Sequence, residues 1–330
     1  MNVLVTGANG FVGAAVTRAL VGRGHEVSVL VRNGADLSNL AGLPVDLRFG
    51  DVRDRESVEA ATTHCNVVFH VAADYRLWVA RPQEMYATNV DGTRNVIDAA
   101  LRANVDRIVY TSSVAALGAS ADDSATDEEA PAVESDMVGH YKRSKFLAER
   151  AAIEMVATRD APVIIVNPST PLGPGDVRPT PTGRIVLDAM RGRIPAFVDT
   201  GLNVVHVDDV AAGHVAAMEK GEIGRRYILG GDDLSLRQIL TQVAETVGRR
   251  PPTVAIPHGV AMLIARGAEA MARVTGSEPR ATVDGVRMSR NKMFYSSKRA
   301  ATELGYRWRP ASDAIEAAVA WFSSERQVST

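Results

Sequence analysis

Short apolar runs alternate with longer segments of helical periodicity in the first half of the chain. Several of the runs are almost wholly apolar, which predicts strands covered by helices on both faces. Their alternation with helices indicates βαβ units and a parallel sheet. The predicted strands are Asn2–Thr6, Glu26–Val31, Val45–Phe49, Val67–Val71, Arg107–Thr111 and Val163–Val166, and the helices between them include Gly10–Gly22, Arg55–Ala61, Asn89–Asn104 and Gly139–Thr158.

The pattern changes at Asn167. Residues 167–176 and 178–183 are dense in Pro and Gly, which predicts irregular structure. A surface linker is one interpretation. We favour a loop over a site, because the segment follows a predicted central strand, where α/β proteins bind ligands.

The rest of the chain is predicted to be mostly helical, with short strands at Val204–Val207 and Tyr227–Leu229. We therefore expect a doubly wound α/β unit, a Rossmann fold, at residues 1–166. Strands near 204–210 and 226–230 are expected to return to it. Residues 167–330 are expected to form a smaller, mostly helical substrate-binding portion.

Composition narrows the functional classes. The 330 residues are 46% hydrophobic and 23% charged, as in ordinary folded proteins. Lys and Arg total 37 against 39 Asp and Glu, so no overall field favours nucleic acid or an anionic membrane. Cys65 is the only cysteine, which excludes an internal disulfide and a multi-cysteine metal site. The N-terminus lacks a secretory signal pattern and no run suits a membrane span, so a cytoplasmic location is expected.

A glycine-rich turn joins the first predicted strand to the first predicted helix. Gly7 permits a tight turn, Gly10 allows close approach of a pyrophosphate, and Gly13 lets the helix pack on the strand. The helix N-terminus would then offer free N–H groups to phosphates. The alternative is a glycine-rich turn without a ligand.

Tyr141 and Lys145 are four residues apart, so a helix presents both on one face. The reference pKa of tyrosine, about 10, is too high for acid–base work near neutrality, and a nearby ammonium lowers it. Ser112 and Ser113 follow a predicted strand and bring hydroxyls to the same edge of the sheet. A half-buried tyrosine beside a solvated lysine is the alternative.

These motifs together resemble the short-chain dehydrogenase/reductase superfamily in its extended form, the NAD-dependent epimerase/dehydratase family. Similar features are Gly50–Val52, His70–Ala73, Asn89–Thr93 and His206–Val210. The resemblance implies catalysis by Ser113, Tyr141 and Lys145, with the lysine also on the nicotinamide ribose. The cofactor-binding set that we expect comprises Gly7, Asn9, Gly10, Phe11, Val12, Gly13, Arg32, Asn33, Asp51, Val52, Val71, Ala72, Ala73, Tyr141, Lys145, Pro168, Ser169 and Thr170. Among these, Asp51 and Val52 would hold the adenine edge and Val71–Ala73 the ribose–phosphate track.

The end of the second strand bears on the choice between NAD and NADP. NAD enzymes usually place a carboxylate here, which binds the ribose 2′-hydroxyl. The same carboxylate would repel the 2′-phosphate of NADP. This chain has Arg32 and Asn33, and no acid before Asp36. NADP is therefore favoured over NAD, and a solvated arginine is the alternative.

Finer motifs, among them Ala72–Trp78 and Gly139–Phe146, resemble bacterial hopanoid-associated sugar epimerases within a dihydroflavonol-reductase-like branch. Nucleotide-sugar epimerases usually carry an arginine shortly before the segment that starts here at His206, and this chain has none. The candidates to replace it are Arg178, Arg184, Arg191 and Arg193. We therefore rank a reductase or dehydrogenase first and an epimerase close behind. A non-catalytic redox sensor ranks third, because such proteins tend to lose the tyrosine or lysine.

The substrate and the assembly are less well determined. Asp74, Tyr75 and Trp78 follow the fourth strand and could line a substrate pocket or simply pack as a loop. We expect no metal site and interpret His206, Asp208 and Asp209 as residues that fix a loop. Asn89–Asn104 and Gly139–Thr158 are apolar over more surface than one sheet covers, and extended-family enzymes pair these helices, so we expect a homodimer. Coverage by the C-terminal helices is the alternative.

Overall fold

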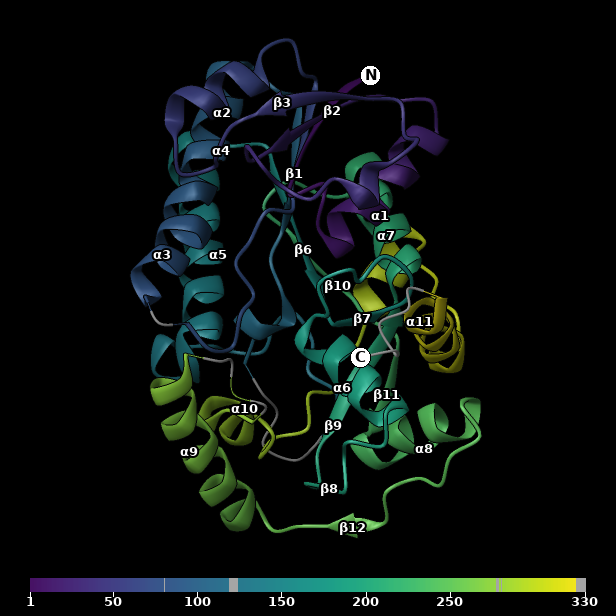
Figure 1. Ribbon diagram of the computed structural model, residues 1–330. Helices are drawn as coiled ribbons and strands as arrows, with labels where there is room; N and C mark the ends of the chain where they lie inside the picture. The colour runs from purple at the N-terminus through teal and green to yellow at the C-terminus, as the bar shows by residue number, and fades with distance from the viewer. Residues whose placement is uncertain (80, 119–123, 277–278, 280, 325–330) are drawn as a thin grey trace.

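The computed structural model describes residues 1–79, 81–118, 124–276, 279 and 281–324. Its centre is a seven-stranded sheet in the order β10-β6-β5-β4-β1-β2-β3, in which every neighbouring pair is parallel (Figure 1). These strands are β1 (Asn2–Thr6), β2 (Glu26–Val31), β3 (Val45–Phe49), β4 (Val67–His70), β5 (Arg107–Thr111), β6 (Val163–Pro168) and β10 (Arg226–Leu229). The doubly wound parallel sheet expected from the sequence is confirmed.

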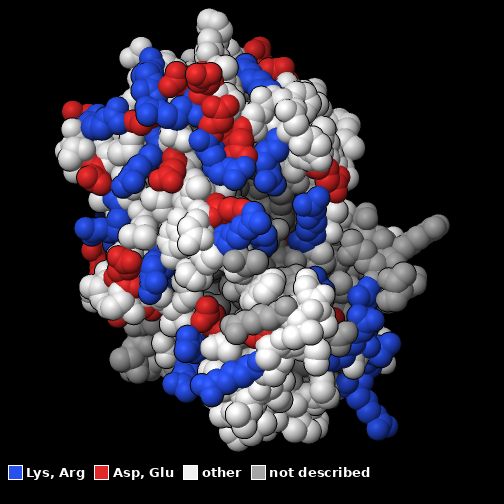
Figure 2. Space-filling view, turned by 60° about the vertical axis from the view of Figure 1, so that its left-hand side comes forward, with Lys and Arg blue, Asp and Glu red and all other residues white. Residues whose placement is uncertain are grey.

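Helices cover both faces of this sheet, as its apolar strands require. Helices α1 and α7 pack on one face, and α2, α4 and α5 pack on the other (Figure 1). Their bounds are α1 (Phe11–Gly22), α2 (Arg55–Thr62), α4 (Gly92–Arg102), α5 (Gly139–Arg159) and α7 (Val207–Lys220). α3 (Pro82–Tyr86) leads into α4 through a π-helical turn at Ala87–Asp91. Figure 2 turns the side with α3 and α5 forward and shows charges of both signs interspersed over its upper half.

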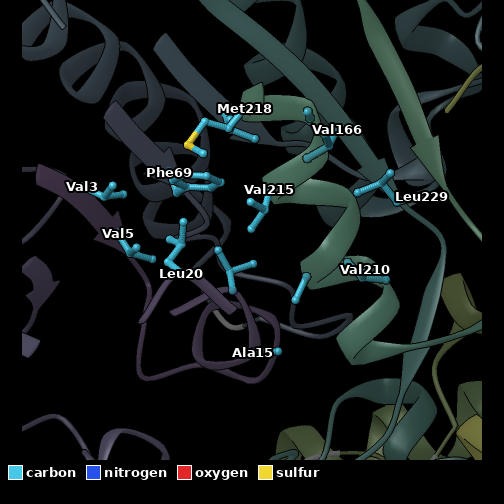
Figure 3. Close-up of a cluster of buried hydrophobic side chains, with 14 of the residues drawn as sticks. Val3, Val5, Ala15, Leu20, Phe69, Val166, Val210, Val215, Met218 and Leu229 are labelled. Atoms are coloured by element: carbon cyan, nitrogen blue, oxygen red, sulfur yellow. The ribbon is translucent and has the colours of Figure 1, made fainter. Parts of the chain in front are cut away.

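The largest core lies between the sheet and the helices α1 and α7. Figure 3 shows Val3 and Val5 of β1 and Phe69 of β4 facing Leu20 of α1 and Val215 of α7. All five residues are buried, with at most 1% of their surface exposed to solvent. Full burial of one such side chain stabilises the fold by about 1.5–3 kcal/mol. The strands that carry the site are thus held rigidly from behind.

The chain beyond β6 builds a smaller portion from helices and two short sheets, one in the order β11-β9-β7 and the other β12-β8. Helices α6, α8 and α11 pack with β7 and β9 around a core of their own, and α9 packs with α10. The elements are β7 (Thr170–Leu172), α6 (Pro181–Met190), β8 (Ala196–Phe197), β9 (Gly201–His206), β11 (Asp232–Ser235), α8 (Leu236–Thr246), β12 (Val254–Ala255), α9 (His258–Thr275), α10 (Val283–Met288) and α11 (Ala311–Ser324).

Two sequence expectations differ from the structure. The strand expected near 204–210, observed as β9, does not return to the main sheet but pairs with β7 and β11. Its pairing partner β7 lies inside the Pro- and Gly-rich segment that we expected to be irregular throughout. Asn203 of β9 fixes the arrangement, since its buried amide donates to Asp233 Oδ1 at 2.7 Å and to the Tyr295 carbonyl at 3.1 Å. β10, by contrast, lies beside β6 in the main sheet.

The outer edge of β10 is covered by a side chain. Glu128 is buried, and its Oε1 accepts a hydrogen bond from the backbone N–H of Ile228 at 2.8 Å. Arg226 of the same strand donates to the Glu128 carbonyl. Burial raises the pKa of the Glu128 carboxyl, although the hydrogen bond from the Ile228 N–H and the charge of Arg299 oppose the shift. The Ile228 N–H of this edge strand is thus satisfied without another strand.

Strand order reverses between β1 and β4, which are neighbours in the sheet. In open α/β sheets, the crevice beyond the carboxyl ends of two such strands is where ligands bind. The glycine-rich turn follows β1, and residues 71–73 follow β4. The fold therefore places the two predicted cofactor segments side by side.

Candidate active site

The glycine-rich turn packs too closely on its surroundings for larger residues. Gly7 has φ of +71°, and a Cβ there would lie 2.7 Å from the backbone of Ala72. A Cβ on Gly13 would lie 2.1 Å from the Gly7 carbonyl oxygen. Around Gly10, by contrast, the Gly7 oxygen at 3.2 Å is the one near neighbour among the described residues. Two glycines are therefore required by packing, and the third leaves the open side of the turn clear.

This turn is suited to a dinucleotide. Gly10 begins α1 without a side-chain cap, so the first N–H groups, from Phe11 to Gly13, point out of the helix end. Beyond the carboxyl end of β6, the Ser169 hydroxyl is buried and has no hydrogen-bond partner among the described residues. Unpartnered buried polar groups are uncommon and call for a ligand or water. Pro168 and Thr170, also predicted to contact the cofactor, flank this hydroxyl.

Tyr141, Ser113 and Lys145 meet at the carboxyl ends of β5 and β6. The Tyr141 hydroxyl donates to Ser113 Oγ at 3.4 Å, and Ser113 Oγ also accepts from the Ala115 N–H at 3.1 Å. The Lys145 ammonium donates to the Thr111 carbonyl at 2.9 Å. Ser113 rather than the buried Ser112 faces the tyrosine. The three side chains named from the sequence are thus brought together by two elements, the end of β5 and the first two turns of α5.

Burial perturbs both titratable groups of this cluster. Lys145 is 3% exposed, and burial lowers its pKa from 10.5 to about 8, against a smaller opposing effect of the Glu149 carboxylate. Burial raises the pKa of Tyr141, and the hydrogen bond with Ser113 partly offsets the shift, so the lowering that the sequence led us to expect from the Lys145 ammonium is wrong. The tyrosine is therefore held protonated near neutrality. Perturbed groups of this kind concentrate at functional sites.

Two buried amides anchor the cluster. Asn89 lies in the π-helical turn before α4, and its amide donates to Ser144 Oγ at 2.8 Å and to the Asp74 carbonyl at 2.9 Å. Asn167 donates to the Ser113 carbonyl at 3.0 Å and to Glu149 Oε2 at 2.7 Å. Each amide thereby ties α5 to a loop of the sheet edge. π turns often occur at functional sites, and this one points an amide inward.

The ends of β2 and β3 carry the residues predicted for the adenosine end of the cofactor. Arg32 and Asn33 are exposed. Asp51 is ion-paired with Arg53, with Arg53 Nη2 at 2.7 Å from Asp51 Oδ2. This hydrogen-bonded pair lowers the pKa of Asp51, and the nearby charge of Arg32 adds to the effect. Arg32 therefore lies close to Asp51 and makes no ion pair of its own among the described residues. Val52 is buried beside them.

The residues predicted for substrate lie where two loops face each other. Burial raises the pKa of Tyr75, the Asp176 charge raises it further and the Arg178 charge lowers it, so both groups lie near the phenol. The Asp74 carboxylate pairs with Arg76 at 2.5 Å. Trp78 is half-buried in the same loop. The Pro- and Gly-rich segment thus approaches the loop after β4, as expected for a loop over a site.

Other residues of this site were not predicted from the sequence. Glu149 could have been found, because it lies eight residues after Tyr141 on the same face of α5. Asn39 could not: its amide donates to the Asn9 carbonyl at 3.2 Å and to the Gly175 carbonyl at 2.9 Å, across 30 and 136 residues of sequence.

His206 and its neighbours fix the start of α7. Arg309 Nη2 lies 3.0 Å from His206 Nδ1 and 2.7 Å from Asp209 Oδ1. The Asp208 N–H also donates to His206 Nδ1, at 3.1 Å. The arginine, which comes from the segment before α11, was not anticipated, and it gives these residues a role in packing.

Three comparisons describe what the chain is similar to. A family model described as NAD dependent epimerase/dehydratase family matches residues 3–230. A Synechocystis protein that is provisionally named dihydroflavonol 4-reductase is 40% identical over 330 residues, which span 99% of this chain and 96% of that protein. Sterol demethylase protein B of Methylococcus capsulatus is 36% identical over 324 residues, 98% of each chain. The crystal structure of the protein designated gox2253 is 48% identical, with a TM-score of 0.89 over 98% of both chains.

We predict that Lys145→Met stabilises the protein at pH 7. Because the pKa of Lys145 falls from 10.5 to about 8 on folding, the unfolded chain binds more protons between these pH values. Below about pH 8 the buried ammonium therefore destabilises the fold by about 3 kcal/mol, at roughly 1.4 kcal/mol per pKa unit. Loss of the bond to Thr111 offsets about 1 kcal/mol. Urea unfolding should show a net gain of about 2 kcal/mol at pH 7 that shrinks towards pH 10.5.

Lys298→Met is the matched control, because Lys298 is exposed and its replacement should leave the free energy of unfolding nearly unchanged. A Lys145→Met protein less stable than wild type at pH 7 would contradict the argument.

Proposed function

Because this chain belongs to the NAD dependent epimerase/dehydratase family, among the extended short-chain dehydrogenases/reductases, and is a nicotinamide-dependent oxidoreductase, we propose that Tyr141, Ser113 and Lys145 are its catalytic residues. The observation that carries the proposal is the contact of the Tyr141 hydroxyl with Ser113, at 3.4 Å. The substrate is a secondary alcohol or the corresponding ketone.

Each residue has a role that its surroundings support. The nicotinamide, when bound, supplies or accepts a hydride at C4. Tyr141 gives a proton to the substrate oxygen in reduction, or takes one from it in oxidation. Ser113 hydrogen-bonds the same oxygen as its charge changes. Lys145, whose ammonium is held by the Thr111 carbonyl at 2.9 Å, hydrogen-bonds the nicotinamide ribose.

We rank reduction first. The raised pKa of Tyr141 keeps the phenol protonated, which is the form needed to donate a proton to a carbonyl oxygen. The provisional name of the Synechocystis relative, a dihydroflavonol 4-reductase, is consistent with this direction. Our choice of NADP agrees with it as well, since Arg32 is exposed at the end of β2 and free to meet a 2′-phosphate.

The second candidate is epimerisation of a nucleotide sugar or polyol with a retained cofactor, as the resemblance to the hopanoid-associated group implies. Arg178 favours it, because the charge of this arginine acts on Tyr75 of the substrate loop and on Asp36 near the glycine turn. Among the four arginines considered, Arg178 is the one whose charge acts on groups in both loops. A diphosphate between these loops would find a cation there.

We also propose that the protein is a homodimer through α4 and α5. Phe146, Leu147, Ile153 and Leu101 remain partly exposed on these helices although the described C-terminal helices are in place. Light scattering of the purified protein would measure the molar mass against the 35.2 kDa of one chain.

Tyr141→Phe should reduce turnover by about 10²–10⁴-fold and leave cofactor affinity nearly unchanged, because it removes the proton-transfer group alone. Steady-state rates with a panel of ketones and NADPH would measure the loss, and fluorescence titration would measure the affinity. Tyr86→Phe is the matched control, since that hydroxyl meets His140 Nδ1 at 3.2 Å and not Ser113. Near-normal turnover of Tyr141→Phe would remove the tyrosine from the mechanism.

Arg32→Asp should weaken NADPH binding by about tenfold or more, because one charge-assisted contact to a phosphate is lost and a repulsive charge is gained. NADH binding should hold or improve. Arg23→Asp, the same change of charge at the far end of α1, should alter neither. Tighter binding of NADH than NADPH by the wild type would show that the NADP preference is wrong.

Absorbance of the purified protein between 300 and 400 nm separates the two candidate activities. We expect a protein without bound reduced cofactor that takes up NADPH, as a reductase does. Reduced cofactor that survives dialysis would instead favour the epimerase.

A further inference from the structure

Helix α9 exposes an apolar side to solvent. Leu263, Ile264 and Met271 are 68%, 55% and 62% exposed, and Val260 and Val274 are 46% and 85% exposed. Successive positions are three, one, seven and three residues apart along the helix, and at about 100° per residue all five fall on one face. The eight other large apolar residues exposed in the described chain are spread over the remaining elements. An apolar concentration of this kind on one helix marks an interaction surface.

The helix is fixed in this orientation by its other side. Ala261 and Ala265 of α9 pack against Val286 of α10 in a small core. Glu269 Oε1 accepts from the backbone N–H of Val283 at 2.7 Å, so the acid of this helix faces the protein. Solvent exposure of the apolar face is therefore imposed by the packing.

Positive charge surrounds this face. Arg266 is exposed on α9 itself, and Arg290 is exposed next to the first turn, where the Ser289 carbonyl lies 3.0 Å from His258 Nε2. Residues 249–292 contain eight Lys and Arg and three Asp and Glu, an excess of five positive charges in a chain whose net charge is −2. The lower part of Figure 2 shows this side as a largely white surface with blue side chains beside it. The near balance of the whole chain hides the local excess.

We propose that α9 docks the protein on an anionic lipid surface, with the helix lying in the plane of the interface. An apolar face next to arginines is the combination that binds such surfaces, through buried apolar area and attraction to acidic headgroups. In the part of the chain that the structure describes, no helix is long and apolar enough to cross a membrane. Docking by one face is therefore the form of membrane contact that these elements support.

Charge also decides against a second copy of the chain as the occupant. A twofold contact brings the same surface of both subunits together. Here it would bring the exposed Arg266 and Arg290 of both subunits into one interface. A lipid surface with negative headgroups instead neutralises that charge.

The docking surface lies on the side of the molecule where α5 begins. A Cβ on Gly139, the first residue of α5, would lie 2.6 Å from Asp284 Oδ2 of α10. α10 in turn packs on α9. One helix therefore separates the lipid-facing residues from the helix end that carries Tyr141. The proposal itself does not depend on any catalytic assignment.

Flotation with lipid vesicles tests the proposal. The full chain should float with vesicles of phosphatidylcholine and phosphatidylglycerol, and much less with phosphatidylcholine alone. Leu263→Gln with Met271→Gln should weaken binding by at least about tenfold, because two apolar side chains no longer enter the interface. Arg266→Glu should weaken it by roughly fivefold or more at low salt, and less at high salt. Ile223→Gln, at a residue 50% exposed in the loop before β10, is the matched control and should bind normally.

A fluorescent label gives a second readout. Cys65 is buried and is the one cysteine of the chain, so Leu263→Cys introduces a selectively accessible thiol. An environment-sensitive dye at this position should shift to shorter wavelength on anionic vesicles, and the same dye on Ile223→Cys should not.

Three results would overturn the proposal: no flotation with anionic vesicles, equal flotation of the double variant, or a wild-type dimer that the double variant dissociates in light scattering. The last result would mean that α9 binds a second copy. Circular dichroism of each variant shows that the fold is retained, which the exposure of the altered side chains leads us to expect.

Discussion

The first turn of α1 is packed directly on the end of β1, and the arrangement of the site depends on that contact. With no Cβ on Gly13, the helix reaches the Gly7 carbonyl, and with none on Gly7 the turn reaches Ala72 beyond β4. Two segments that are far apart in the sequence, the turn after β1 and the residues after β4, thus converge where the strand order reverses. The open helix end and the end of β4 have fixed relative positions as a result. A bulkier residue at Gly7 or Gly13 would separate them.

Burial of polar groups at this junction is unfavourable for the fold and useful for chemistry. The ammonium of Lys145 lies in surroundings that disfavour its charge, and the Ser169 hydroxyl is unpartnered among the described residues. Neighbouring apolar packing compensates for both, because strands covered on two faces bury far more area than these groups occupy. Departures of this kind from optimal stability are expected where a ligand must be recognised.

Much of this could be predicted from the sequence, for physical reasons that also explain the failures. Six strands and the main helices are encoded locally, since apolar runs and helical spacing report burial directly. Tyr141 and Lys145 were predictable because one helix carries both. The pairing of β9 was wrong because pairing partners are chosen by tertiary packing, and β7 was missed because Pro171 in it is untypical of a strand. Asn39 bonds to Gly175 across 136 residues and Arg309 to Asp209 across 100, so no window of sequence contains their signal.

The covered edge of β10 limits how the molecule associates. A strand with unpaired N–H groups invites addition of a strand from another chain, which is a common start of aggregation. Here the buried Glu128 carboxylate satisfies the Ile228 N–H, and the Glu128 backbone lies beside the same strand, where it accepts a hydrogen bond from Arg226. The seven-stranded sheet therefore cannot grow past β10 into a continuous sheet between molecules. At the β10 edge, contacts with another molecule must therefore be made by side chains rather than by addition of a strand.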